Sequence, residues 1–209
     1  GRTGTVTPVA NMEPMQLAGT TVRRATLHNA DVIDTLDLHE NDIVIVEKGG
    51  EIIPKITGVS LNDRPSDARI PDFPTVCPDC GTPLRRDPEE AKWFCPNRDG
   101  CPMQIKGRII HFMSRKAKNI LAGESTVAQF FDAGFVRTPA DLYSITMPQL
   151  LSLEGWKEKA AQRFLTSLAE SVNVPFERVL YAIGIRYVGE TTAKSIARHF
   201  GDIDSLMKA

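Results

Sequence analysis

Several kinds of residue and segment are missing from this chain of 209 residues, and each absence disfavours a class of protein. Residues 1–72 contain no Phe, Tyr or Trp, so this part offers no aromatic platform on which single-stranded nucleic acid could stack. No apolar run approaches the roughly 18 residues of a membrane-spanning helix, so we expect no membrane partner. We find no signal peptide, and therefore expect no disulfide framework of the kind found in small secreted domains.

Cysteine is absent outside residues 77–101, where the four cysteines of the chain follow the spacing C-x2-C-x14-C-x5-C. They are Cys77, Cys80, Cys95 and Cys101. Two pairs of thiolates at such spacing predict one structural Zn²⁺ bound by four sulfurs. Gly81 would let the first pair curl back on the ion. A redox dithiol is disfavoured because residues 81–83 cannot continue as a helix, and a catalytic zinc because four sulfurs leave no position for water.

The net charge is close to zero, at −1, and the basic residues are unevenly distributed. Residues 76–117 hold 8 Lys and Arg against 5 Asp and Glu, whereas residues 1–75 hold 7 against 11 and residues 118–209 hold 10 of each. Any contact with nucleic acid must therefore depend on local clusters and backbone donors rather than on bulk charge.

Residues 1–73 are expected to form a small all-β barrel. Short strands are predicted near Val6 and at residues 20–24, 42–47 and 52–56, with a short helix at residues 29–38. The strand at 42–47 is apolar at nearly every position, as in a strand buried on both sides. These elements indicate an OB fold or an SH3-like barrel, which composition alone does not separate.

A Pro- and Asp-rich linker leads to the expected zinc finger and its connecting helix, at residues 74–117. Residues 118–209 are expected to be all-α, with an internal repeat of 32 to 34 residues. The aligned pairs are Gly123-Glu124, Lys157-Glu158 and Gly189-Glu190, and each Glu should open an amphipathic helix. The repeat predicts helix-hairpin-helix units. A tetratricopeptide array has a similar period, but its signature Trp, Leu-Gly and Tyr positions are absent.

A helix-hairpin-helix loop places free backbone N–H groups at the positive end of a helix, where they can bind phosphate without reading bases. No loop here carries both glycines of the apolar-x-Gly-apolar-Gly form. Leu121 and Tyr187 replace the first glycine in two loops, and Lys157 replaces the second in the middle loop, which keeps Gly155. We expect the third loop, which ends at Gly189, to contribute most. The alternative is that the loops only connect packed helices.

Six short segments stand out beside the cysteine spacing: residues 1–4 (GRTG), 7–10 (TPVA), 24–29 (RATLHN), 47–55 (EKGGEIIPK), 111–115 (HFMSR) and 184–190 (GIRYVGE). Together these features resemble the C-terminal half of bacterial NAD-dependent DNA ligases. The resemblance covers essentially the whole chain. It implies a multidomain chain with an all-β OB barrel, a small four-cysteine zinc finger and an incomplete all-α helix-hairpin-helix domain.

The resemblance implies the DNA-binding part of a ligase, which holds nicked double-stranded DNA for an adenylation domain of the same polypeptide. It also implies a bacterial, cytoplasmic and nucleoid-associated protein whose NAD and Mg²⁺ bind mainly outside this chain. The resemblance directs Arg2 and Arg24 to the duplex, although Arg24 could equally be a solvated surface residue. The residues expected to contact DNA are Arg2, Arg24, Lys48, Gly155, Arg186 and Gly189.

The lysine that these ligases adenylate, in a K-x-D-G motif, is missing. The nearest sequence is residues 97–100 (NRDG), which lacks the lysine and lies inside the zinc loop. We therefore expect no catalytic residue and no activity from this chain alone. An adenylation domain is expected before Gly1, and a further hairpin after Ala209.

Two other functions compete with this interpretation. A zinc hydrolase or deaminase needs an open metal site and an H-x-E pattern, but His39 is followed directly by Glu40, and Val76 rather than Pro precedes Cys77. A zinc-ribbon and OB module of another repair or ribosome-associated protein could bind RNA or DNA. For single strands, such a module would need the aromatic platforms that residues 1–72 lack.

Overall fold

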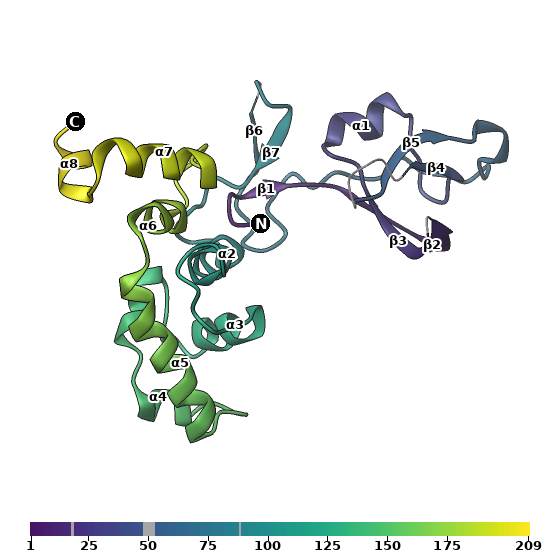
Figure 1. The fold of residues 1–209 in the computed structure, drawn as a ribbon. Coiled ribbons are helices and arrows are strands. Elements are labelled where there is room, and N and C mark those ends of the chain that lie inside the picture. Colours follow the sequence, from purple (N-terminus) through teal and green to yellow (C-terminus); the bar gives the residue numbers. More distant parts are fainter. Residues whose placement is uncertain (18, 48–52, 88) are drawn as a thin grey trace. The chain divides into compact units, whose positions relative to one another are not determined.

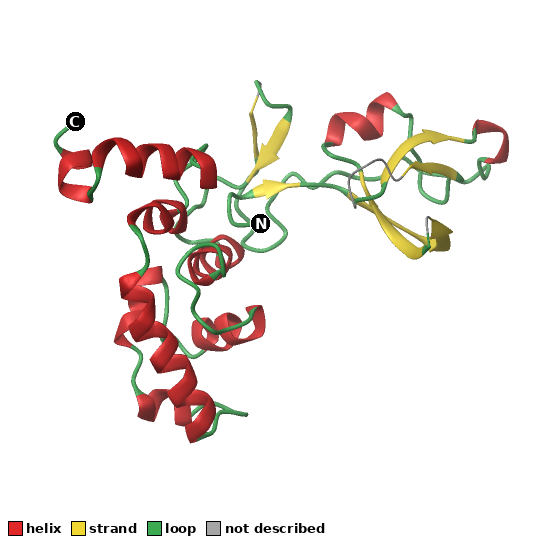
Figure 2. Ribbon diagram, viewed as in Figure 1, coloured by secondary structure: helices red, strands yellow, loops and turns green. Residues whose placement is uncertain are grey.

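The computed structural model describes residues 1–17, 19–47, 53–87 and 89–209, and the chain forms two compact units (Figure 1). The first unit comprises Gly1 and residues 3–101, and the second comprises Arg2 and residues 102–209. All the described strands lie in the first unit, whereas the second is helical (Figure 2). No helix among the described residues is long and apolar enough to cross a membrane.

A curled four-stranded sheet forms the first part of unit one, in the order β2-β3-β5-β4. The strands are β2 (Val9–Leu17), β3 (Thr20–Thr26), β4 (Val44–Glu47) and β5 (Lys55–Val59). Strand β3 pairs antiparallel with β2 and parallel with β5, and β5 pairs antiparallel with β4. The core under this sheet consists of Ala25, Leu27, Ile33, Leu38 and Ile56. The sheet and its core agree with the predicted small barrel.

The predicted short helix is α1 (Ala30–Thr35), which places Ile33 in the core. Asn29 begins it, because its side chain accepts a hydrogen bond from the backbone N–H of Val32 at 3.2 Å. A short 3-10 turn, η1 (Leu61–Asp63), follows β5.

Three details of the predicted strands are wrong. Strand β4 is not buried on both sides, because it lies at the edge of the sheet and leaves Ile45 56% exposed. The preceding Ile43, also predicted within that strand, lies outside it and is 57% exposed. The next strand begins at Lys55 rather than at residue 52, which lies outside the described residues. Pro54 has no N–H for the ladder, so pairing starts after it.

A second sheet, in the order β1-β7-β6, surrounds the cysteines. Its strands are β1 (Thr5–Val6), β6 (Arg85–Asp87) and β7 (Lys92–Phe94). Thr5 and Val6 pair with Phe94 and Trp93, so the first strand of the chain belongs to the zinc-finger sheet. The sequence had placed Val6 with the barrel strands, and this prediction is wrong. Val6 packs instead against the cluster of Cys77, Leu84, Cys95 and Cys101.

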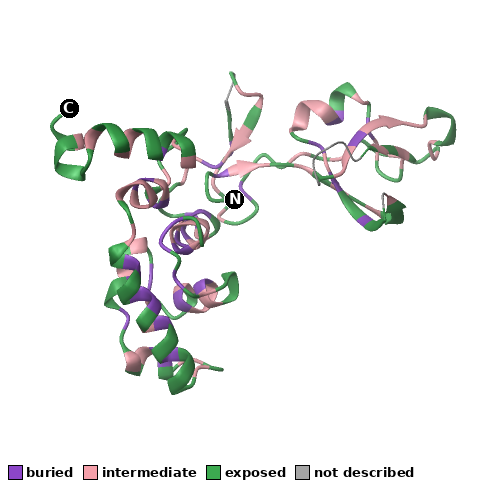
Figure 3. Ribbon diagram, viewed as in Figure 1, coloured by how far each residue is buried: buried purple, intermediate pink, exposed green. Residues whose placement is uncertain are grey.

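The second unit consists of seven α-helices and two short 3-10 turns. They are α2 (Pro102–Met113), α3 (Glu124–Asp132), η2 (Pro139–Ser144), α4 (Met147–Leu151), α5 (Glu158–Glu170), η3 (Ser171–Asn173), α6 (Phe176–Ile183), α7 (Glu190–Phe200) and α8 (Ile203–Met207). Each Glu predicted to open a helix does so, in α3, α5 and α7. Figure 3 shows the buried positions that α2 and α5 contribute to the core, which includes Ile109, Phe130, Leu142, Leu150 and Phe164.

His111 on α2 contacts Tyr181 on α6 and links the two helices. Its Nε2 lies 2.8 Å from the carbonyl oxygen of Tyr181, and its ring packs edge-on against the Tyr181 ring at 4.7 Å between centroids. A carbonyl only accepts, so Nε2 carries the proton and donates. Burial lowers the pKa of His111 despite this bond, and the nearby Arg2 lowers the pKa further. The imidazole is therefore kept neutral, and its Nε2 is used by the bond to Tyr181.

This packing predicts a loss of stability in acid. The pKa of His111 is below its ordinary 6.5 in the folded chain, so the unfolded chain binds more protons as the pH falls through that value. We expect the melting temperature to fall between about pH 7.5 and about pH 5.5. His111→Gln keeps an amide donor but does not titrate, and it should show a smaller fall. Equal acid sensitivity of the two proteins, measured by circular dichroism, would contradict the assignment.

Candidate functional site

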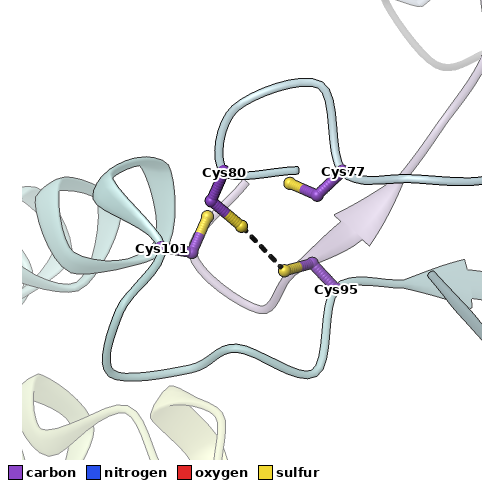
Figure 4. Close-up of side chains that lie close together, drawn as sticks. All are labelled: Cys77, Cys80, Cys95 and Cys101. Atoms are coloured by element: carbon purple, nitrogen blue, oxygen red, sulfur yellow. Dashed lines mark hydrogen bonds between the residues drawn. The ribbon is translucent and has the colours of Figure 1, made fainter. Parts of the chain in front are cut away.

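The four cysteines face one another across a small space in the first unit (Figure 4). Their Sγ atoms all lie within 4.8 Å of one another, and those of Cys80 and Cys95 are 3.6 Å apart. Four sulfurs around a tetrahedral Zn²⁺ lie about 3.8 Å apart, as follows from a Zn–S bond of about 2.3 Å. Cys80 is half-buried and the other three are buried. The arrangement therefore fits a closed, structural zinc site.

Local backbone geometry positions these thiols. The first knuckle closes through hydrogen bonds from Gly81 N to the Cys77 carbonyl at 2.9 Å and from Cys77 N to the Thr82 carbonyl at 2.8 Å. Gly81 has φ +70°, the left-handed conformation that favours glycine, as the sequence predicted. Cys95 directly follows β7, and Cys101 directly precedes α2.

The surrounding groups favour the thiolate form at one position and oppose it at another. Hydrogen bonding by Thr82 lowers the pKa of Cys80 to about 6, whereas burial raises the pKa of Cys95. Asn97 directs its Nδ2 at Cys80 Sγ from 3.8 Å and accepts a hydrogen bond from Gly100 N at 3.0 Å. The sequence at residues 97–100 is thus a turn that supports the cysteine cluster.

The second and third hairpin loops share one backbone conformation. Gly155 has φ +81° and Tyr187 has φ +65°, and each lies two residues before the residue that caps the following helix. Tyr187, which replaces a glycine, therefore adopts the conformation that glycine would supply. It is 76% exposed, and the Arg186 guanidinium lies over its ring, 5.0 Å from the centroid.

The first hairpin loop differs in two ways. Its left-handed residue is Asn119, with φ +54°, rather than Leu121. The backbone N–H of Leu121 donates to Ser167 Oγ at 3.0 Å, so this donor is used within the fold.

The helices after the three loops begin without side-chain caps, at Gly123, Lys157 and Gly189. Gly189 has φ −82°, so a side chain there would cause no backbone strain. A Cβ at Gly189 would meet nothing within 4 Å. Glu190 opens α7, and its carboxylate pairs with Lys116 and Lys194, each at 3.2 Å. These two lysines lower the pKa of Glu190.

The predicted DNA-binding residues are divided between the two units. Arg24 lies exposed on β3 in the first unit. Arg2 belongs to the second unit. Its backbone passes close to Gly107, because a Cβ added at Gly107 would lie 2.9 Å from the Cα of Arg2. A Cβ at Gly184, the start of the third loop, would lie 3.0 Å from Arg2 Nη1. Arg2 is thus beside the third hairpin, and Lys48 lies outside the described residues.

Sequence reasoning missed one group of basic residues in the second unit. Lys116 pairs with Glu190 at the start of α7, and Arg178 binds the Lys116 carbonyl and lies close enough to Lys118 to lower its pKa. In the sequence, only the run at residues 115–118 (RKAK) marks two of these three residues.

Comparison with known families identifies the modules. The NAD-dependent DNA ligase OB-fold domain matches residues 1–68, and the NAD-dependent DNA ligase C4 zinc finger domain matches residues 76–102. Residues 1–68 and 76–102 are thus similar to the OB-fold and zinc-finger domains of NAD-dependent DNA ligases. A helix-hairpin-helix motif matches residues 178–209, which hold the third hairpin. The resemblance stated from the sequence is confirmed, and so are the OB fold, the zinc finger and the helix-hairpin-helix region.

Curated DNA ligases match along this whole chain. The DNA ligase of Parabacteroides distasonis is 58% identical over 212 residues, and that of Flavobacterium psychrophilum is 54% identical over 211 residues. That of Porphyromonas gingivalis is 50% identical over 209 residues. The matches cover 100% of this chain but only 31–32% of each of these relatives, so the chain spans about a third of their length.

The cysteine geometry predicts one tightly bound zinc per chain. Cys77→Ser should lose the metal and loosen the zinc-finger sheet, while the barrel sheet stays folded because its core is separate. Elemental analysis would count the metal, and hydrogen exchange would locate the loosened strands. Thr82→Val is the matched control and should keep the metal, because Thr82 is not a ligand. Purified, reduced protein without zinc would contradict the assignment.

Proposed function

We propose that this chain binds nicked double-stranded DNA and holds it for sealing by an adenylation domain of the same polypeptide. The observation that carries the proposal is the third hairpin, whose exposed loop leads into an uncapped helix N-terminus at Gly189. It belongs to a chain whose other modules match those of NAD-dependent DNA ligases.

The three hairpins rank in a definite order as phosphate sites. The third and second have the left-handed loop residue and an uncapped following helix, and they lead the ranking. The third also has Arg2 and Arg186 beside it. The first is last, because Ser167 already occupies the N–H of Leu121. All three would contact the sugar-phosphate backbone, so binding should not depend on base sequence.

In the first unit, Arg24 supports the same role from an exposed strand position, and Lys48 remains a proposed contact on sequence grounds. The absence of aromatic residues from residues 1–72 favours duplex over single-stranded substrate. Zinc contributes no chemistry here, since four sulfurs leave it no open position. NAD and Mg²⁺ would serve the adenylation domain, and the protein would act at the bacterial nucleoid in the cytoplasm.

The contribution of this chain to sealing is positional. It would hold the two ends of the nick in line, which lowers the entropic cost of bringing the reacting groups together. We propose no catalytic residue in this chain. Its NRDG sequence has no lysine, and Asn97 there supports the cysteine cluster.

Gly189→Val should weaken duplex binding with only a small fall in the melting temperature. The backbone there is in an ordinary region and a Cβ meets open space, so the change costs only the poorer helix cap that valine makes and acts mainly on the approach of a phosphate. Gly155→Val should in addition destabilise the chain by about 1–2 kcal/mol, because its φ of +81° disfavours a β-branched residue. Binding isotherms and melting curves would separate the two effects. Duplex affinity that survives Gly189→Val but is abolished by Gly155→Val would reverse the ranking of the loops.

The isolated chain should form no covalent AMP adduct with NAD or ATP. It should still bind nicked duplex, with an affinity that falls with salt at a log–log slope of about −0.9 per neutralised phosphate. Fused to an adenylation domain of the same family, it should accelerate sealing of a pre-adenylated nick by positioning the ends.

The comparison is between the adenylation domain alone and the fusion, and a fusion with Gly189→Val is the matched control. Equal sealing rates with and without this chain, or AMP labelling of the isolated chain, would contradict the proposal.

A further inference from the structure

Lys118 is a charged side chain in an unusual place. It is only 7% exposed, and it is the one buried lysine or arginine in the part of the chain that the structure describes. It lies in the turn between α2 and α3. Burying an ammonium group is costly unless an anion accompanies it. No described carboxylate pairs with Lys118.

The charged group that acts on the pKa of Lys118 is another cation, Arg178. Burial lowers the pKa of Lys118, and the positive charge of Arg178 lowers the pKa further. Arg178 is held by backbone oxygens, since Nη2 donates to the Arg115 carbonyl at 2.5 Å and Nε donates to the Lys116 carbonyl at 3.3 Å. Two cations therefore lie close enough to repel each other, and the described hydrogen-bond partners of Arg178 are carbonyl groups.

The backbone of this segment is well fixed. Ser114 accepts hydrogen bonds at its carbonyl from Ala117 N and Asn119 N, both at 2.9 Å, and Lys118 N donates to the Phe112 carbonyl at 3.1 Å. We call Arg115, Lys116 and Lys118, together with Arg178, the basic turn. The backbone that carries Arg115, Lys116 and Lys118 is therefore fixed before any ligand arrives.

The basic turn borders the third hairpin. Lys116 Nζ lies 3.2 Å from Glu190 Oε2, and Glu190 is the first residue of α7. Lys194, one turn further along α7, pairs with the other carboxylate oxygen of Glu190 at 3.2 Å. The carboxylate at the start of α7 is thus neutralised from both sides, so it would repel an approaching phosphate less.

We propose that the basic turn binds a phosphate of the DNA backbone beside the third hairpin, and that this phosphate is the counter-charge of Lys118. The inference rests on the proposed duplex binding and adds a second contact to it, contributed by Arg178 on the first helix of the hairpin and by residues 115–118, which are distant from the hairpin in sequence. The contact is to a phosphate, so its contribution to affinity should be the same for all DNA sequences. A bound phosphate also restores the pKa of Lys118 towards its ordinary value, because it replaces repulsion with attraction.

The decisive variant is Lys118→Met, which keeps an apolar stem of similar length and removes the charge. Lys208→Met is the matched control, because it removes one exposed charge at the end of α8. Lys118→Met should weaken duplex binding by about three- to ten-fold and reduce the salt slope by about 0.9, the share of one phosphate. Lys208→Met should change the slope by much less.

A direct readout on the unaltered protein does not depend on any variant. The NMR signal of the Lys118 side chain, followed against pH, should titrate at higher pH when duplex DNA is added. Inorganic phosphate at matched ionic strength should produce a smaller change. An unchanged Lys118 titration with bound duplex, or a Lys118→Met slope equal to wild type, shows that Lys118 is only a packing residue.

These outcomes differ from a failure of the proposed function. If the wild-type chain binds no duplex at all, the proposed function falls and the inference falls with it. A second outcome is that the wild-type chain binds duplex and Gly189→Val weakens this binding, while the Lys118 titration and the Lys118→Met salt slope do not change. The hairpin proposal then stands, and the proposed phosphate contact of the basic turn is wrong.

Discussion

The convergence of four thiols is the interaction on which the first unit depends. It gathers a knuckle at Cys77 and Cys80, the end of β7 at Cys95 and the residue before α2, Cys101. The apolar side chains packed there are few, with Leu84 buried and Val6, Phe73 and Trp93 partly buried. So small a core supplies little hydrophobic stabilisation, and a bound metal is what such a segment needs in order to hold its shape.

Local signals in the sequence predicted much of the helical unit. A glutamate after a glycine or lysine, followed by an apolar stripe, was sufficient for α3, α5 and α7, because caps and periodicity are properties of neighbouring residues. The cysteine spacing was sufficient for the metal centre. The pairing of β1 with β7 could not be predicted in this way, because a two-residue strand has no periodicity and its partner lies almost ninety residues away.

Two features of the candidate DNA surface also could not be predicted from the sequence, for a different reason. A tyrosine by itself favours the ordinary right-handed region, and the hairpin imposes the left-handed conformation on Tyr187 at a cost of about 1–2 kcal/mol. Lys118 reads as one member of a basic run, and only packing shows that it is buried beside Arg178. Both depend on which segments the fold brings together, and spacing along the chain does not carry that information.

The pairing of β1 with β7 has a consequence for how the first unit is connected. The chain contributes a strand to the zinc-finger sheet at Thr5–Val6, leaves to build the whole barrel sheet, and returns to complete the finger at β6 and β7. The barrel is therefore an insertion within the finger, attached at both of its ends. A domain tethered by two connections loses the free rotation that a single linker allows. Cutting either connection alone would leave the barrel joined to the finger.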